Sequence, residues 1–495
     1  MGAEAAIGTL AELGLTALGG QEAQITGISV DSRLVKPGHL FAALPGVQAH
    51  GGSFIQYALR QGAAAILTDQ KGAQIARSEI AASGAALVLA QDPRQALAFA
   101  AALWFGAQPE IAIAVTGTNG KTSVASFTRQ IWGQLGFEAA NIGTTGVEGA
   151  YTAPTGHTTP EPITLHRLMA DMAQHGITHV AMEASSHGLE QRRLDGMQLA
   201  AAGFTNFSQD HLDYHADFEE YFAAKAGLFG RVLSEDGIAV VNSNDPRSAE
   251  ISLLAQNRGQ EVLTVGRNET ASLRIVAQRF EAMGQTLLFD HNDRAYEVSL
   301  KLIGGFQAEN VLMAAALAIA AGADAQEVFS VLPQLQTVRG RMELAATRKN
   351  GANVFVDYAH TPDALATACR ALRPHVLGRL VLVFGAGGDR DTGKRPLMGQ
   401  AAEAHADVIF VTDDNPRSED PALIRRAILG GCLEAIEVPD RAEAILRGVD
   451  ALGPGDVLLI AGKGHETGQI VGDDILPFDD LEQASVAVAA LDGIL

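Results

Sequence analysis

The 495-residue sequence is poor in aromatic residues, cysteines and long apolar runs. Aromatics make up 5% of the chain, so its cores must be built mainly from Ala, Val, Leu and Ile. The two cysteines, Cys369 and Cys432, are too few for a disulfide framework or a ligand cluster, and we interpret them as buried free thiols. The longest apolar run, Val311 to Ala321, is too short to span a bilayer. The N-terminus lacks the basic start and cleavage site of a signal peptide. We therefore expect a cytoplasmic protein without stable membrane insertion.

Positive charge is also scarce. The chain has 36 lysines and arginines against 57 aspartates and glutamates, which gives a formal net charge of −21. Such a charge disfavours nucleic acids and anionic membrane surfaces as partners. It still permits an anionic small substrate where cations are concentrated locally. The lysines and arginines in glycine-rich or polar loops are therefore the most informative ones.

The clearest motif is the segment from Ile111 to Ser123. The apolar residues 111–115 predict a buried strand, a glycine turn follows, and a helix begins at Lys121. This layout is typical of a phosphate-binding loop, in which backbone N–H groups and a lysine contact phosphates and a threonine hydroxyl ligates magnesium. The loop is shorter than the usual pattern, and a plain structural turn is the alternative. The segment predicts nucleotide binding by Gly117, Thr118, Asn119, Gly120, Lys121, Thr122 and Ser123.

The length and the order of predicted elements indicate three domains of the α/β class. Residues 1–107 form a small domain with strands predicted at 25–30, 39–44 and 63–68 and a helix at 54–62. Residues 108–336 alternate strands and helices, with strands at 111–115, 180–182, 202–205 and 238–241, which predicts a largely parallel sheet covered by helices. Residues 337–495 repeat this pattern and predict a Rossmann-like domain. We find no internal repeats.

Polar loops follow four predicted strands of the last domain. The strands lie at 354–356, 380–384, 408–411 and 457–460, and ligand sites in such sheets lie at the carboxyl ends of strands. Turn chemistry alone does not readily explain polar loops at all four ends. The loops are Asp357–His360, Gly385–Arg390, Asp413–Arg417 and Gly462–Glu466.

Two further positions suggest a metal site. Glu183 follows a predicted strand beside the phosphate loop, where a carboxylate can hold magnesium directly or through water. The acidic and histidine-rich segment 205–217 could be a metal cluster or a polar loop with a helix cap. Lys225 follows it, and a lysine near a metal must be neutralised, exposed or converted by CO₂ to a carbamate. The residue pattern by itself favours an exposed lysine.

Seven motifs follow one another along the chain: Thr116–Thr122, Met182–Gly188, Asp210–His215, Gly340–Glu343, Asp357–His360, Asp414–Arg417 and Gly462–Glu466. In this order they give the chain a specific resemblance to the Mur ligases, in particular to those that add 2,6-diaminopimelate. The resemblance covers essentially the whole chain.

The resemblance implies an enzyme of peptidoglycan precursor synthesis, and thereby of cell-wall growth, cell shape and division. Its substrates would be ATP, UDP-N-acetylmuramoyl-L-alanyl-D-glutamate and meso-diaminopimelate, and the new amide bond would form through an acyl phosphate. We expect a monomer. The N-terminal domain would bind UDP, the central P-loop domain ATP, and the C-terminal domain the amino acid. The lysine-adding ligase of the same family, folylpolyglutamate synthase and a regulatory P-loop NTPase are the alternatives. A first domain that binds UDP argues against the folate enzyme.

The resemblance also implies roles for individual residues. Lys121, Glu183, His211 and Lys225 would be catalytic, and Mg²⁺ would be held by Thr122, Glu183, His211 and a carbamate on Lys225. The ATP site would add Asn310, Arg341 and Asp357. The UDP-muramoyl dipeptide would contact Val30, Ser32, Val47, Gln48, Ala49, Thr158, Thr159, Ser185, Gln191 and Arg193. The diamino acid would contact Arg390, Asp414, Asn415, Pro416, Arg417, Gly462 and Glu466.

Two residues depart from the family pattern. Gln307 stands after Phe306, where the family usually has asparagine, and His50 replaces the aspartate common in the first-domain loop. The roles of both are open from the sequence.

Overall fold

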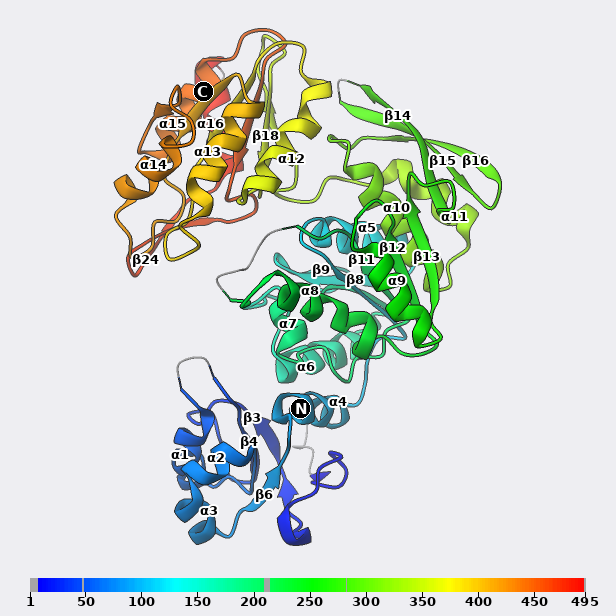
Figure 1. Cartoon of the computed structure of the whole chain (residues 1–495), viewed down its shortest axis with the longest axis vertical. Coiled ribbons are helices and arrows are strands. Elements are labelled where there is room, and N and C mark those ends of the chain that lie inside the picture. Colours follow the sequence, from blue (N-terminus) through cyan, green and yellow to red (C-terminus); the bar gives the residue numbers. More distant parts are fainter. Residues whose placement is uncertain (1–7, 47–48, 209–213, 282, 494–495) are drawn as a thin grey trace.

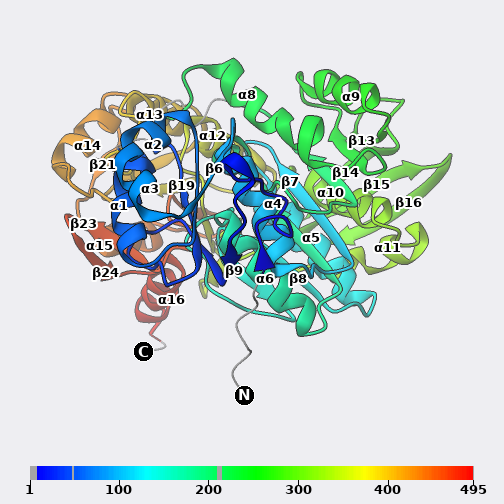
Figure 2. The ribbon, with the colours of Figure 1, turned by 90° about the horizontal axis from the view of Figure 1, so that it is seen from below.

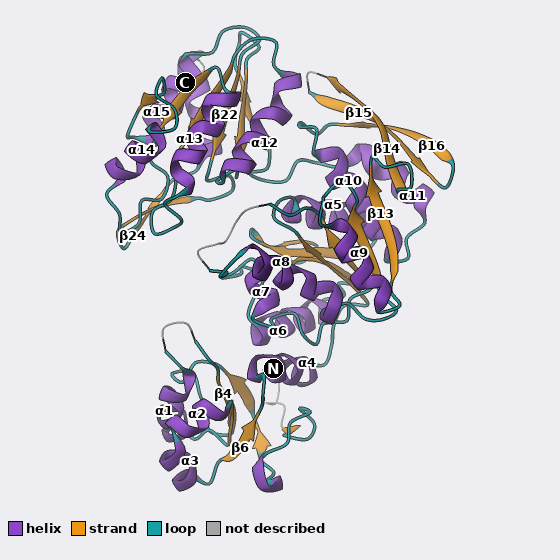
Figure 3. Ribbon diagram, in the orientation of Figure 1, coloured by secondary structure: helices purple, strands orange, loops and turns teal. Residues whose placement is uncertain are grey.

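The computed structural model describes residues 8–46, 49–208, 214–281 and 283–493. Its three main sheets follow one another along the chain and lie in three bodies along the long axis of the molecule (Figure 1). Helices flank the strands of these bodies (Figure 3). The predicted α/β fold class is thereby confirmed. The predicted boundaries near residues 107 and 336 fall between the sheets, and we retain them as a proposed division.

The N-terminal sheet has four parallel strands in the order β3-β4-β5-β6. Leu40 and Leu67 face a core that includes α4, whereas Phe41 and Ile66 face a core that includes α1 and α3. The strands predicted at 39–44 and 63–68 correspond to β4 and β5. The elements are β1 Gly8–Thr9, β2 Gln24–Ile25, β3 Gly27–Ser29, β4 His39–Ala43, α1 Ile55–Arg60, β5 Ala65–Thr68, α2 Gln70–Ile75, α3 Arg77–Ser83, β6 Ala86–Leu89 and α4 Pro93–Phe105.

The central sheet has ten strands in the order β16-β15-β14-β13-β12-β11-β7-β10-β8-β9. The strands from β14 to β8 in this order are parallel, and antiparallel partners close both edges. The strands are β7 Ile111–Thr116, β8 Ala139–Gly143, β9 Gly146–Gly149, β10 His179–Glu183, β11 Ala201–Phe204, β12 Ile238–Asn242, β13 Glu261–Gly266, β14 Leu273–Glu281, β15 Gly284–His291 and β16 Arg294–Leu300.

Strand β7 is buried on both faces. Ile113 and Val115 pack in one core with α5 and α10, while Ala112 and Ala114 pack in the other with α6. A strand covered on both faces appears as a continuous apolar run, which is why this strand could be predicted. The helices are α5 Lys121–Gln134, α6 Pro162–Gln174, α7 Ser186–Glu190, α8 Phe218–Gly227, α9 Ser248–Asn257, α10 Gln307–Ala320 and α11 Ala325–Val331.

The C-terminal sheet has six strands in the order β17-β18-β22-β19-β20-β21, and only the edge strand β17 is antiparallel to its neighbour. The four predicted strands correspond to β18, β19, β20 and β22. The elements are β17 Glu343–Thr347, β18 Asn353–Asp357, α12 Pro362–Leu372, β19 Leu380–Phe384, α13 Lys394–His405, β20 Val408–Val411, α14 Pro421–Leu429, β21 Ile436–Glu437, α15 Arg441–Asp450, β22 Val457–Ala461, β23 Gly468–Val471, β24 Asp474–Pro477 and α16 Asp480–Leu491.

Helix α4 joins the N-terminal body to the central one. It lies beside α6 in two perpendicular views (Figures 1 and 2). The Gln95 amide on α4 donates to the Asp195 carboxylate at 3.1 Å, and Arg192 Nε donates to the Asp92 carboxylate at 2.8 Å. These polar contacts tie the first domain to the segment after α7.

Both cysteines are buried and free, as predicted. Burial raises the pKa of the Cys369 thiol to about 12, so this thiol stays protonated at neutral pH. Within the described residues, none of the helices combines the length and apolar character needed to cross a bilayer.

Candidate active site

The glycine turn after β7 packs closely against two polar side chains. Gly117 has a φ of +144°, and a Cβ there would lie 1.9 Å from Oγ1 of Thr205. Gly120 has a φ of +87°, and a Cβ there would lie 2.7 Å from Oδ1 of Asn310. A side chain at either position would combine an unfavourable backbone conformation with a steric clash. The two glycines therefore let this loop approach the end of β11 and the start of α10.

Hydrogen bonds from two side chains, Lys121 and Asn206, hold the backbone of the loop. Lys121 Nζ donates to the carbonyl oxygens of Gly117 and Thr118 at 2.9 and 2.8 Å. Asn206, which follows β11, accepts the N–H of Asn119 at 2.9 Å and donates to its carbonyl oxygen at 3.1 Å. These bonds fix a loop whose backbone N–H groups begin a helix, which is the geometry that binds phosphate.

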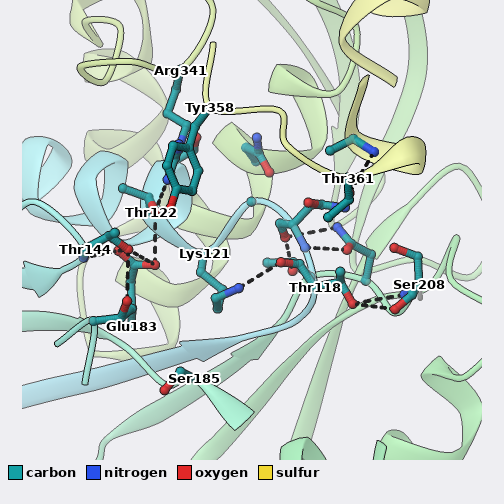
Figure 4. A pocket seen from close by; sticks show the side chains of 18 of the residues that line it. Thr118, Lys121, Thr122, Thr144, Glu183, Ser185, Ser208, Arg341, Tyr358 and Thr361 are labelled. Carbon is teal, nitrogen blue, oxygen red and sulfur yellow. Dashed lines mark hydrogen bonds between the residues drawn. The ribbon is translucent and has the colours of Figure 1, made fainter. Parts of the chain in front are cut away.

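Thr122 and Glu183 meet near the carboxyl ends of the neighbouring strands β7 and β10 (Figure 4). Thr122 Oγ1 donates to Oε2 of Glu183 at 3.0 Å, and Oε1 accepts the N–H of Thr144 at 2.9 Å. Arg341 reaches over from the C-terminal domain, where its Nη2 donates to Thr122 Oγ1 at 3.0 Å. A hydroxyl, a carboxylate and a guanidinium from two domains thus converge on one point.

The oxygen donors at this point fit a magnesium ion. Thr122 and Glu183 supply the hard oxygens that Mg²⁺ prefers. Lys225 on α8 is 1% exposed, and its Nζ donates to the carbonyl oxygen of Gly117 at 2.8 Å, so the exposed lysine favoured by the residue pattern is wrong. His211 lies outside the described residues. Within those residues, no group of three or more His, Cys, Asp or Glu forms a metal site, so the full ligand set stays a prediction.

Hydrogen bonds link the residues predicted for the muramoyl dipeptide. Thr159 Oγ1 donates to the backbone carbonyl of Glu183 at 2.8 Å and accepts the N–H of Ser185 at 3.0 Å. Arg193 donates to the Thr159 carbonyl at 2.7 Å and to Oε1 of Gln191 at 2.8 Å. The sequence places these residues in separate segments, and the fold gathers them beside Glu183.

One cavity of about 730 Å³ joins the phosphate loop, Glu183 and C-terminal residues 357–361 (Figure 4). Its volume lies in the range of small-molecule sites. Thr158 also lines it, with Oγ1 3.3 Å from Oγ1 of Thr144. The predicted residues that line the cavity are Thr118, Asn119, Gly120, Lys121, Thr122, Ser123, Thr158, Thr159, Glu183, Ser185, Arg193, Lys225, Asn310, Arg341 and Asp357.

The C-terminal side of the cavity is built around Asp357. Its carboxylate accepts the N–H groups of Met342 and Ala359 at 2.7 and 2.8 Å. Burial raises the pKa of Asp357, although Arg341 and the two N–H groups act in the opposite direction. The Arg341 guanidinium carbon lies 4.4 Å from the centre of the Tyr358 ring. Asp357 therefore holds the backbone at Met342, next to Arg341. Tyr358 packs against the Arg341 guanidinium, which reaches Thr122.

The two residues that depart from the family pattern have clear local contacts. Gln307 is buried at the start of α10, where its Oε1 accepts a bond from the Asn310 amide at 3.1 Å. His50 Nδ1 accepts the N–H of Gly52 at 2.9 Å, and its Nε2 lies 3.1 Å from Oδ1 of Asp69. Gln307 thus orients Asn310, whose Oδ1 lies close to Gly120 of the phosphate loop. His50 holds the turn at Gly52 through its hydrogen bond.

The residues predicted for the UDP end lie on the N-terminal domain. Val30 follows β3 and is 40% exposed, and Ser32 belongs to the next turn. Ala49 immediately precedes His50, while Val47 and Gln48 lie outside the described residues. Val30, Ser32 and Ala49 do not line the central cavity.

The loops after β20 and β22 share a polar network in which Asn415 and Lys463 are buried. Asn415 Nδ2 donates to Oε2 of Glu466 at 2.8 Å, and Asn415 Oδ1 accepts the N–H of Ile470 at 2.9 Å. Lys463 is 0% exposed, and its Nζ donates to Asn415 Oδ1 at 3.2 Å and to Glu466 Oε2 at 3.3 Å. This lysine fixes two residues predicted to hold the diamino acid.

Arg417, Arg390 and Asp414 lie on the same side of the C-terminal domain. Arg417 has a φ of +53°, and its Nη1 donates to the Gly388 carbonyl at 2.8 Å. Arg390 Nη1 donates to the carbonyl of its own neighbour, Asp389, at 3.0 Å. Gly462 has a φ of +118°, and a Cβ there would lie 2.5 Å from Oδ2 of Asp414, so a side chain would combine a strained backbone with displacement of that carboxylate. Together with the buried Pro416, the predicted diamino-acid residues lie outside the lining of the central cavity.

Sequence reasoning missed three residues that organise the site. Thr144 and Asn206 follow β8 and β11, so their position depends on the strand order around β7 and β10. Lys463 lies inside the motif Gly462–Glu466, but its complete burial was not anticipated. The signal that could have found all three is their place directly after a predicted or neighbouring strand.

Comparison with known proteins agrees with this geometry. Three family models match the chain: "Mur ligase family, catalytic domain" at residues 24–104, "Mur ligase middle domain" at 115–318, and "Mur ligase, glutamate ligase domain" at 340–464. A curated relative from Bradyrhizobium diazoefficiens is 49% identical over 473 residues, which are 94% of this chain and 95% of the relative. The chain belongs to the Mur ligase family.

Two further relatives extend the comparison of this Mur ligase. One from Rhizobium meliloti is 49% identical over 471 residues, covering 94% of this chain and 95% of its own. Both curated relatives are named UDP-N-acetylmuramoyl-L-alanyl-D-glutamate–2,6-diaminopimelate ligase. A solved structure of a ligase with that name has a TM-score of 0.69 and 35% identity, covering 94% of this chain and 95% of the other.

Proposed function

We propose that this Mur ligase uses ATP to join meso-diaminopimelate to the D-glutamate of UDP-N-acetylmuramoyl-L-alanyl-D-glutamate. The observation that carries the proposal is the cavity of about 730 Å³ in which the phosphate loop, the Thr122–Glu183 contact and the predicted dipeptide residues meet. The names of relatives that are 49% identical over nearly the whole chain support this choice of substrates.

The reaction has two steps. The γ-carboxylate of D-glutamate first attacks the γ-phosphorus of ATP, which forms an acyl phosphate and releases ADP. An amine of the diamino acid then attacks the acyl carbon, loses a proton and expels inorganic phosphate, leaving an amide. Lys121 and the N–H groups of the loop, which line the cavity, would offset the repulsion between the two anions of the first step. Arg341 adds a second cationic group beside Thr122.

Magnesium belongs to this proposal as well. Thr122, Glu183, His211 and a carbamate on Lys225 would hold it, and it would neutralise phosphate and carboxylate charge. The burial of Lys225 beside Gly117 supports the carbamate, since an ammonium is costly to bury near a cation. Reaction with CO₂ replaces that positive charge with a negative one.

The outer domains would hold the two ends of the substrates. The UDP end would lie on the first domain at Val30, Ser32 and residues 47–49. The distal carboxylate of the diamino acid would bind Arg417 as a two-bond fork, and Asp414 or Glu466 would accept the distal ammonium. Arg417 is half-buried, and its Nη1 donates to the backbone carbonyls of Gly388 and Asn415. No carboxylate is bonded to its guanidinium among the described residues, so the fork would be completed by the substrate carboxylate. We further propose a cytoplasmic monomer.

A substrate panel tests the function. Purified protein is supplied with ATP, Mg²⁺, the UDP-dipeptide and one amino acid at a time, and ADP, phosphate and product mass are measured. We expect ADP release that depends on both the UDP-dipeptide and meso-diaminopimelate, with a product heavier by one diaminopimelate residue. Preference for lysine would identify the lysine-adding ligase instead. ATP hydrolysis that is independent of both substrates would indicate a P-loop NTPase module.

A further inference from the structure

A fully buried ion pair lies under the diamino-acid loops. Arg441 is the first residue of α15 and Asp480 is the first residue of α16, and both side chains are 0% exposed. Arg441 Nε donates to Oδ1 of Asp480 and Nη2 donates to Oδ2, both at 2.7 Å. This is the two-bond fork that fixes the plane of a guanidinium.

The same guanidinium contacts the bases of both loops. Its Nη2 donates to the carbonyl oxygen of Ala461 at 3.0 Å, and its Nη1 donates to that of Asp413 at 3.3 Å. Ala461 ends β22 directly before Gly462, and Asp413 directly precedes Asp414. Nη1 also lies 4.0 Å from Oδ2 of Asp414. One side chain therefore connects the two loops and places a positive charge beside Asp414.

Stability alone does not account for this pair. A cation in the first turn of a helix opposes the helix dipole, so Arg441 does not serve α15. A buried ion pair also loses so much hydration that apolar residues of similar size are often at least as stabilising. The pair instead fixes the orientation of the Asp414 carboxylate. This carboxylate lies against Gly462, so a small shift of either loop would change its orientation.

We propose that Arg441, oriented by Asp480, is a positioning residue for the diamino acid. It sets the spacing of the loops that carry Asp414 and Glu466, the two carboxylates proposed for the distal ammonium, and it balances the charge of Asp414. This inference rests on the proposed function of the two loops. Arg441 itself does not touch the substrate.

The chain offers a matched control at the other end of α16. Arg348 Nη2 lies 2.8 Å from Oδ1 of Asp492, with side chains 12% and 5% exposed. Asp492 also accepts the N–H of Lys349 at 2.7 Å. This pair belongs to the same domain, with Asp492 as the C-cap of α16, and its hydrogen bonds among the described residues reach neither diamino-acid loop. Asp492→Asn should therefore report on loss of an ion pair without loss of loop position.

The test compares Asp480→Asn and Arg441→Lys with Asp492→Asn. For each full-length variant, kcat and the KM values for meso-diaminopimelate and for ATP are measured, together with the thermal midpoint. We expect the KM for meso-diaminopimelate to rise about tenfold or more in the first two variants. The KM for ATP should change by less than about twofold, because the phosphate loop lies in another domain. Arg441→Lys keeps the charge but loses the fork, so it should fail like Asp480→Asn.

Unchanged KM for the amino acid in folded Asp480→Asn and Arg441→Lys would overturn the inference. An equal rise in Asp492→Asn would do the same, since it would mark a general loss of stability. If Asp480→Asn does not fold, Arg441→Lys and Asp480→Glu decide by the same criterion. A wild-type protein that ignores meso-diaminopimelate contradicts the proposed function instead, and the KM comparison is then made with the amino acid that it does use.

Discussion

At the scale of single residues, the neighbours Lys121 and Thr122 face different surroundings. Lys121 is half-buried in the loop and bonds to loop carbonyls, whereas Thr122 is 6% exposed and bonds to both Glu183 and Arg341. Removal of a half-buried lysine allows water to replace its bonds. Removal of the Thr122 hydroxyl would leave buried partners unsatisfied. A substitution of Lys121 is therefore a cleaner test of catalysis, because it should change the free energy of unfolding less than a substitution of Thr122.

Lys121→Ala should abolish turnover while the fold survives. The lysine contributes positive charge where two anions must meet, and it contributes little to the core. Phosphate release and far-UV circular dichroism are measured together. Lys71→Ala, which changes an exposed lysine on α2, serves as the control and should leave turnover unchanged. An active, folded Lys121→Ala variant would falsify the role of this loop.

Lys225 should carry a carbamate in the active enzyme. Lys225→Ala should lose activity, and short carboxylic acids should restore part of it by supplying the missing anionic group. Lys225→Arg should remain inactive, because arginine cannot form the carbamate. Activity measured with and without added carboxylic acid checks this. A fully active Lys225→Arg variant, or electron density for an unmodified ammonium with substrates bound, would contradict it.

At the scale of helices and strands, the sequence predicted best where burial is continuous. Strands β7, β19 and β22 are buried on both faces, so their apolar runs could be recognised. Strand β14 has two buried residues, Leu273 and Ile275, followed by six exposed or half-buried ones, and it carries two arginines. No apolar run marked it, and the antiparallel edge with β15 and β16 was missed. Propensity alone could not separate a half-exposed strand such as β14 from a loop.

In the site, features that are contiguous in sequence could be predicted, whereas contacts between distant segments could not. The phosphate loop could be predicted because its parts are contiguous in sequence. The bonds of Asn206 to Asn119 and of Thr144 to Glu183 depend on which strands lie beside β7 and β10, and a single sequence does not give that order. Recognition of the family added Arg341, whose contact with Thr122 spans 219 positions of the chain. Contacts of that kind arise from tertiary packing.

The loop after β20 should set amino-acid specificity through Arg417. Diaminopimelate carries a distal carboxylate that lysine lacks, so lysine would leave the guanidinium without its partner at a cost of roughly 1–3 kcal/mol. Arg417→Ala should raise the KM for diaminopimelate steeply and narrow the gap to lysine. The measurement is the ratio of kcat/KM for the two amino acids. An unchanged ratio in the variant, or equal use of lysine by the wild type, would rule this arginine out.

Helix α6 should make stability depend on pH through His166. Burial lowers the pKa of His166 to about 4, although Glu161 acts in the opposite direction. Its Nε2 lies 3.1 Å from the Asp195 carbonyl, which indicates that Nε2 carries the proton, and its Nδ1 has no hydrogen-bond partner among the described residues. Between pH 6.5 and 4 the unfolded chain binds the extra proton and the folded chain does not. The free energy of unfolding should therefore decrease as the pH is lowered from 6.5 to 4, by about 3 kcal/mol in total.

Calorimetry at pH 7.5 and 5 checks this contribution. His166→Gln retains a donor near Asp195 but cannot titrate, so its thermal midpoint should fall less between the two pH values than that of the wild type. His175→Gln, which changes an exposed histidine at the end of the same helix, should retain the wild-type dependence. Equal slopes in the wild type and His166→Gln would show that this histidine does not contribute.

At the scale of the whole molecule, the reacting groups are divided among separate bodies. The central cavity reaches the C-terminal domain through Arg341 and residues 357–361, but the diamino-acid loops lie outside it. The β23–β24 hairpin, which pairs with the Arg417 loop, extends from the C-terminal body on the side of the other two bodies (Figure 1). Amide formation requires the amine and the acyl carbon to approach to about 3–3.5 Å. We therefore expect the C-terminal domain to move toward the central one during the reaction.

Substrate binding should thus make the molecule more compact. In small-angle X-ray scattering, the radius of gyration should decrease when a non-hydrolysable ATP analogue, the UDP-dipeptide and meso-diaminopimelate are all present. The decrease should be smaller when the diamino acid is omitted, because its loops then lack the ligand that joins them to the centre. In the Arg341→Ala variant the decrease in the radius of gyration with all three ligands should be smaller than in the wild type, because the variant lacks the bond between the C-terminal domain and Thr122. Unchanged scattering in the fully loaded protein would contradict domain closure, because the amine would then have to cross the space between the bodies without any movement of the domain that binds it.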